Sequence, residues 1–222
     1  MKNILVVAAH PDDEVLGCGG TIAKHDFEGD KVHVVFMTEG IKSRAQFSEK
    51  DLIKRAEASK LAQTILNIES INSLGFQDNQ MDNIPLLQIV QKLEVIINRV
   101  KPAIIYTHYY GDLNVDHQLT HNAVMTACRP IPNFIVKEIY GFEVLSSTDW
   151  SNSQKFTFKP NYFVNISKYF SKKITAAKAY KEEMRDPPHS RSLKHIEVLA
   201  QHRGFSVGVE MAEAFEVYRI IN

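Results

Sequence analysis

Apolar runs alternate with amphipathic stretches along the first half of the chain, and this pattern predicts its elements. Residues 4–8 form a continuous apolar run, and residues 32–37 form a second one that only His33 interrupts. Both are rich in β-branched residues, which is typical of buried strands. Between them a cluster of glycines opens a predicted helix over 20–28. A strand, a helix and a strand within about forty residues form a βαβ unit, so we expect a parallel sheet.

The same alternation continues to the middle of the chain. Helical periodicity predicts helices over 48–66, with Ser48 as the N-cap, and over 86–100. A shorter strand is predicted at 71–74, before Gly75, and an apolar run predicts another at 102–107. A polar cluster and then a helix to about residue 128 follow the second of these strands. Ligands bind at the carboxyl ends of parallel strands, so we expect the residues after the strands at 4–8 and 102–107 to meet.

The remaining third of the chain is richer in short β-type runs. We predict strands at 136–145, 156–158, 162–166 and 214–220, and helices over 167–185 and 192–202. No repeat, low-complexity segment or long linker interrupts the chain. We therefore expect one domain over residues 1–222, of the α/β class: a Rossmann-like, mostly parallel sheet flanked by helices, with β-rich additions in the C-terminal half.

Composition narrows the class of partner. Lys+Arg and Asp+Glu are equal at 26 each, so the chain lacks the excess positive charge that attracts nucleic acid or an anionic membrane. The sequence holds no apolar run of membrane-spanning length and no signal peptide, so we expect a cytoplasmic protein. Cys18 and Cys128 belong to no CxxC pair, which argues against a disulfide framework. The expected partner is a small molecule, and the sequence leaves a homo-oligomer open.

The first predicted strand ends in Ala9-His10-Pro11-Asp12-Asp13-Glu14. Three adjacent carboxylates repel one another, and a helix N-terminus supplies only about half an elementary charge to offset them. A well-capped helix start would explain the acids alone. It does not explain His10, and a metal ion would supply more positive charge. A second polar cluster, from His108 to His117, follows the strand at 102–107.

Catalytic zinc typically takes three protein ligands and leaves one position for water. His10, Asp13 and His117 make a set of that kind, with two imidazoles and one carboxylate. We expect one Zn²⁺ per chain, although this set also binds other first-row divalent metals. Zinc lowers the pKa of a bound water towards about 7, and Asp12 beside that water would act as general base. These residues predict a metallohydrolase.

The first motif, with Gly17, Gly19 and Gly20 after it and Asp116-His117 downstream, resembles the PIG-L or LmbE-like zinc deacetylases. That resemblance implies removal of an N-acetyl group from an amino sugar such as N-acetylglucosamine or its conjugate. It implies the zinc ligands and the general base named above. It also implies that Arg55 and Asp78 contact sugar hydroxyls or a substituent.

One position departs from the pattern of this family. Many members read His-Pro-Asp-His at the second cluster; the first histidine faces the oxyanion and the aspartate, which is Asp116 here, orients it. This chain reads Asn114-Val115-Asp116-His117. Asn114 can donate a neutral hydrogen bond but cannot carry a proton. His108, or a histidine of the second half such as His189, is therefore a candidate for that role.

Arg191 is a further candidate, because it follows the break at 186–189 and could reach an anionic aglycone such as a phosphate. Two other functions stay open. One is a metal-dependent amidase that cleaves a larger acyl or thiol-conjugate amide. The other is a sugar-binding relative without turnover. The intact set of Asp12, His10, Asp13 and His117 favours an enzyme over a binder.

Overall fold

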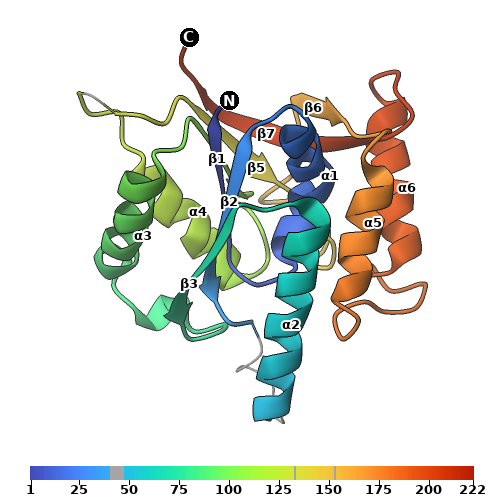
Figure 1. The fold of residues 1–222 in the computed structure, drawn as a ribbon, viewed down its shortest axis with the longest axis horizontal. Helices are drawn as coiled ribbons and strands as arrows, with labels where there is room; N and C mark the ends of the chain where they lie inside the picture. Colours follow the sequence, from blue (N-terminus) through green and yellow to red (C-terminus); the bar gives the residue numbers. More distant parts are fainter. Residues whose placement is uncertain (41–47, 133, 153) are drawn as a thin grey trace.

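The computed structural model describes residues 1–40, 48–132, 134–152 and 154–222, and it has three layers, with helices on both faces of a central sheet (Figure 1). The sheet has seven strands in the order β3-β2-β1-β4-β5-β7-β6. The first five strands are parallel to one another, whereas β7 is antiparallel to both β5 and β6. The prediction of a Rossmann-like, mostly parallel sheet is therefore confirmed. The strands are β1 (Asn3–Ala8), β2 (Lys31–Thr38), β3 (Ser70–Phe76), β4 (Ile104–His108), β5 (Glu138–Phe142), β6 (Tyr162–Asn165) and β7 (Ala212–Ile220).

The helices divide between the two faces of the sheet. Helices α3 and α4 cover one face, and α1, α2, α5 and α6 lie on the other (Figure 1). Within the part of the chain that the structure describes, none of them is long and apolar enough to cross a membrane. The helices are α1 (Asp13–Phe27), α2 (Glu49–Leu66), α3 (Leu86–Val100), α4 (Val115–Ala127), α5 (Phe170–Ala179) and α6 (Leu193–Phe205), with a short 3₁₀ helix at Met81–Asn83.

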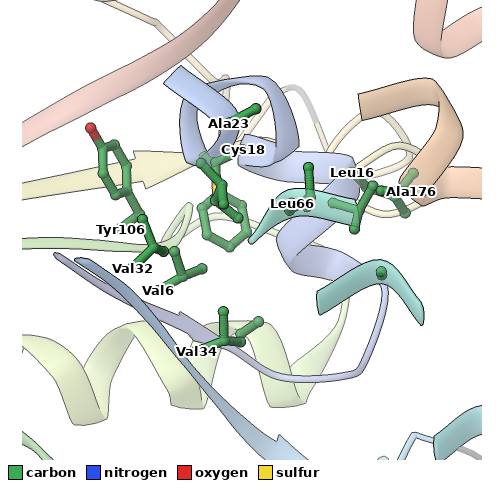
Figure 2. Packing of buried hydrophobic residues seen from close by; sticks show 14 of the residues in the cluster. Val6, Leu16, Cys18, Ala23, Val32, Val34, Leu66, Tyr106 and Ala176 are labelled. Atoms are coloured by element: carbon green, nitrogen blue, oxygen red, sulfur yellow. The ribbon is translucent and has the colours of Figure 1, made fainter. Parts of the chain in front are cut away.

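The first strand supplies side chains to two hydrophobic cores. Ile4, Val6 and Ala8 point into the core under α1, part of which is shown in Figure 2. Leu5 and Val7 point into the core under α3 and α4. Successive side chains of a strand alternate between faces, so a continuous apolar run fits a strand that is covered on both sides.

Helix α1 begins at Asp13, seven residues before the start that the glycines suggested, so the acidic motif runs directly into the helix. The glycines allow close packing. A Cβ at Gly17 would overlap the ring of Phe142, and one at Gly20 would lie 2.8 Å from side-chain carbons of Ile166. The glycines thus bring α1 against β5 and the residues after β6.

The same helix is kinked at Cys18, where φ is −146° and ψ is 24°. Two buried side chains bind the backbone groups that the kink exposes. Lys173 donates to the Leu16 carbonyl at 2.8 Å, and the Glu213 carboxylate accepts from the Gly20 and Thr21 amides at 2.9 and 2.7 Å. Lys173 and Glu213 also pair at 2.6 Å, so each charge is balanced.

Several predicted elements are shorter, longer or absent. Residues 156–158 form no strand, because Phe156 and Phe158 pack against the rings of Tyr110 and Tyr109 instead of pairing in the sheet. The helix predicted to reach residue 185 ends at Ala179, and turns follow it. Strand β5 covers only part of the predicted 136–145, and α6 extends past the predicted end at 202.

We predict that Leu93→Ala destabilises the fold by about 2–5 kcal/mol, because Leu93 is 0% exposed and its removal leaves a cavity under α3. Leu87→Ala on the same helix is the control, since Leu87 is 65% exposed and should change the free energy of unfolding by less than about 0.5 kcal/mol. Urea unfolding followed by circular dichroism measures both. Equal effects would contradict the assignment of this face to the core.

Candidate metal centre and active site

The two polar clusters meet because the strands that precede them are neighbours. β1 and β4 pair in parallel, with Ile4 opposite Ile104 and Val6 opposite Tyr106. Residues 9–12 connect β1 to α1, and residues 109–114 connect β4 to α4. Both connections therefore lie at the carboxyl edge of the sheet, as the sequence predicted.

Three donor atoms form a compact triangle at this edge. The His10 Nδ1 atom lies 3.2 Å from the Asp13 Oδ2 atom and 3.2 Å from the His117 Nε2 atom. The third side, from His117 Nε2 to Asp13 Oδ2, is 3.3 Å. Donors bound tetrahedrally to zinc at about 2.0–2.1 Å stand about 3.3–3.4 Å apart, so the triangle has the size of a face of such a site.

The electrostatics of the triangle favour a cation. Burial would lower the pKa of His117, but Asp13 and Asp112 raise it to about 9. Burial would raise the pKa of Asp13, yet His117, His10 and His108 hold it well below its usual range. The Asp13 Oδ1 atom is buried without a hydrogen-bond partner among the described residues. The residues therefore fit a divalent metal, which imidazole and carboxylate donors bind.

His117 is supported by a residue to which sequence reasoning gave no role. The Oδ1 atom of Asp112 lies 3.2 Å from His117 Nδ1, the nitrogen that faces away from the triangle. Ser147 and Thr148 donate to the two Asp112 oxygens. A carboxylate on the far nitrogen of a ligating histidine fixes its tautomer and orientation. The signal was an aspartate in the loop between the strand and His117.

His10 is held by two further carboxylates. Its Nε2 atom lies 3.2 Å from both Asp78 and Asp116. Burial would lower the pKa of His10, but hydrogen bonds with Asp116, Asp13 and Asp78 raise it well above its usual value. Asp116 also accepts from the Asn79 and Met81 amides, at 2.7 and 3.2 Å. In this chain Asp116 therefore orients His10 and the loop before the 3₁₀ helix.

Asn114 serves as a helix cap. Its side-chain oxygen accepts from the Asp116 amide at 2.8 Å, and its Nδ2 atom donates to Asn79 at 3.0 Å. His108 lies behind the triangle, fully buried, with its ring stacked on His117 at 3.9 Å. Its Nε2 atom accepts from the Ala9 amide at 2.8 Å. In this arrangement His108 supports the loop of the first motif.

Asp12 has an unusual backbone, with φ at 118°, a conformation that residues other than glycine rarely adopt. Glu14 accepts the Asp12 amide proton at 2.8 Å and a hydrogen bond from Tyr180 at 2.6 Å. Burial raises the pKa of Glu14 to about 7. The third acid of the motif therefore fixes the backbone of the first.

The side chain of Asp12 contacts two arginines. Its Oδ2 atom accepts from Arg191 at 2.7 Å, and its Oδ1 atom lies 3.6 Å from Arg55. Burial raises the pKa of Asp12, while Arg191 and Arg55 act in the opposite direction. Both arginines also contact Glu183, at 2.5 Å from Arg55 and 3.7 Å from Arg191. Nothing in the sequence pointed to Glu183, which lay inside a predicted helix.

Comparison with known families finds a match over more than half of this chain. The family described as GlcNAc-PI de-N-acetylase, PIG-L, matches residues 5–128. That range contains the whole donor triangle and Asp12.

Individual proteins named as deacetylases are also similar to this chain over most of its length. An uncharacterized deacetylase of Escherichia coli, YaiS, is 32% identical over 81% of this chain and 91% of its own. The diacetylchitobiose deacetylase of Thermococcus kodakarensis is 25% identical over 96% of this chain and 82% of its own. The solved N,N'-diacetylchitobiose deacetylase of Pyrococcus horikoshii superposes with a TM-score of 0.79 at 22% identity, covering 98% of this chain and 84% of its own. At that identity the superposition supports the fold alone.

We predict that Asp112→Asn lowers the affinity for zinc by about 10–100-fold, because the amide cannot hold the His117 tautomer as the carboxylate does. Competition with a chromophoric chelator measures the affinity. Asp82→Asn is the matched control, since Asp82 is exposed near the same edge of the sheet. If both variants bound zinc as tightly as the wild type, the supporting role of Asp112 would be wrong.

Proposed function

Since this chain belongs to the GlcNAc-PI de-N-acetylase (PIG-L) family, we propose that it is a zinc-dependent hydrolase that removes the N-acetyl group from an amino sugar or amino-sugar conjugate. The observation that supports this most directly is the buried triangle of His10, Asp13 and His117 next to Asp12. The relatives are named deacetylases, which hydrolyse amide bonds.

In this proposal the triangle holds the metal. A metal bound there would lower the pKa of water and polarise the acetyl carbonyl, and so lower the barrier to addition. Asp78, Asp112 and Asp116 keep both imidazoles in the tautomers that leave Nδ1 of His10 and Nε2 of His117 facing the triangle. These contacts preorganise the donors before substrate arrives.

Asp12 is the proposed general base. Its Oδ2 atom is committed to Arg191, whereas its Oδ1 atom is buried with no hydrogen-bond partner among the described residues. Oδ1 can therefore take a proton from the attacking water. Water oxygen bonds to the acetyl carbon, the C–N bond breaks, and the proton held at Asp12 passes to the leaving nitrogen. The products are acetate and the free amine.

The amino sugar would bind beside Arg55 and Asp78. The Arg55 Nε atom is buried and donates to no described residue, so a sugar hydroxyl could accept from it. Asn114 contributes no proton in this scheme, because its side-chain oxygen caps α4 and its nitrogen donates to Asn79.

One cavity favours a second candidate, an amidase for larger acyl groups. A cavity of about 680 Å³ lies between α2 and the edge formed by β2 and β3, with Arg55 and Pro11 on its wall. Leu52, Ile53 and Phe36 make much of the lining apolar. Such a space would accommodate an alkyl chain, so acyl length is a variable in the test below.

We expect the metal-loaded protein to release acetate from N-acetylglucosamine or N,N'-diacetylchitobiose, and EDTA to abolish the release until zinc is restored. An enzyme-coupled acetate assay measures the release of acetate. A free-amine assay on N-octanoylglucosamine tests the second candidate function, the amidase for larger acyl groups. Faster cleavage of the octanoyl amide would favour the amidase. Binding of these sugars without any cleavage would instead indicate a sugar-binding relative.

We predict that Asp12→Asn keeps its zinc and lowers kcat by at least about two orders of magnitude, as expected when a general base is lost. Asparagine suits the comparison because it tolerates positive φ better than most residues. Asp13→Asn should behave differently and lose both zinc and activity. Metal analysis alongside turnover separates the two roles, and wild-type turnover in Asp12→Asn would refute the assignment.

A further inference from the structure

Four charged side chains form a closed ring next to the donor triangle. Asp12 contacts Arg191 at 2.7 Å and Arg55 at 3.6 Å, and Glu183 contacts the same two arginines at 3.7 and 2.5 Å. Each carboxylate thus lies between two guanidinium groups, and the charges alternate around the ring. Asp12, Arg55 and Glu183 are buried, and Arg191 is half-buried.

The ring balances the charge of both arginines within the protein. A phosphate or carboxylate on a substrate would therefore meet guanidinium groups whose positive charge Asp12 and Glu183 already balance. Among the described residues, the other charged groups around His10 and His117 are the carboxylates Asp78, Asp112 and Asp116. With a divalent metal at the triangle, these three carboxylates and Asp13, Asp12 and Glu183 still formally exceed the four positive charges of the metal and the two arginines. An anion entering here would therefore meet net negative charge in a buried site, where like charges repel strongly.

Contacts within the protein fix the position of Glu183. Its amide donates to the Tyr180 carbonyl at 2.9 Å in the turn after α5, which fixes the backbone. Arg55 lies over the Tyr180 ring at 5.6 Å, so the ring and the carboxylate position the guanidinium together. Loss of the Glu183 charge would leave two guanidinium groups against Asp12 alone.

We propose that Glu183 is a specificity-determining residue, which neutralises the arginine pair so that the site selects amino-sugar amides with uncharged substituents and rejects those that carry phosphate or carboxylate. This inference rests on the proposed deacetylase function. It replaces the expectation that Arg191 binds an anionic aglycone, because Asp12 and Glu183 already balance the charge of that guanidinium.

The test compares wild type, Glu183→Gln and Glu182→Gln, the last being a neighbouring exposed glutamate. In wild type, kcat/KM for N-acetylglucosamine should exceed that for its 6-phosphate by about tenfold or more. Glu183→Gln should narrow or reverse this preference, and Glu182→Gln should keep it. A wild-type preference for the phosphorylated sugar would overturn the inference, even if Glu183→Gln failed to fold.

A binding measurement separates this inference from the proposed function. Calorimetry with inorganic phosphate on the zinc-loaded proteins needs no turnover, and phosphate on the metal contributes equally in all three. The Kd for phosphate should fall by about tenfold or more in Glu183→Gln, since a new charge-assisted hydrogen bond becomes available. An unchanged Kd in folded Glu183→Gln would refute the role of Glu183, whereas absence of acetate release in wild type would refute the function alone.

Discussion

Both nitrogens of the His10 imidazole contact charged or polar side chains, and the arrangement of the site depends on these contacts. Nδ1 faces Asp13 and His117, which come from the starts of α1 and α4, while Nε2 faces Asp78 and Asp116. The His10 imidazole therefore joins the segments that follow β1, β3 and β4. A small rotation of this imidazole would break contacts at both nitrogens at once, so the surrounding carboxylates fix its orientation together.

Burying this much negative charge is tolerated because each carboxylate has an opposite charge or backbone amides as partners. Asp116 accepts two amides, Glu14 accepts one amide and a tyrosine hydroxyl, and Asp112 accepts two side-chain hydroxyls. Asp12 is supported by arginines that Glu183 keeps in place. A metal at the triangle would complete the balance, which is why the first motif makes physical sense only together with the second.

The features that could be predicted from the sequence are those set by local residue pattern and by the right-handed connections of parallel sheets. The apolar runs of β1 and β2, the stripe of α3 and the meeting of His10 with His117 all follow from period and from the shared edge of neighbouring strands. Residue choices that serve distant partners were not predictable. The local sequence around Glu183 gives no sign that it pairs with two arginines. Asn114 acts as a helix cap at the position where the family pattern has a histidine. Phe156 and Phe158 alternate with polar residues as in a strand, yet they pack on tyrosines.

The kink of α1 has a consequence for how this chain folds. The Leu16 carbonyl is bound by a lysine 157 residues later, and the Thr21 amide by a glutamate 192 residues later. Contacts of such sequence separation form late, because closing long loops is entropically unfavourable. The acidic motif leaves the ribosome early, yet the helix that follows it acquires its final course only when β7, near the other end, has joined the sheet. Assembly of the donor triangle is thereby coupled to completion of the whole fold.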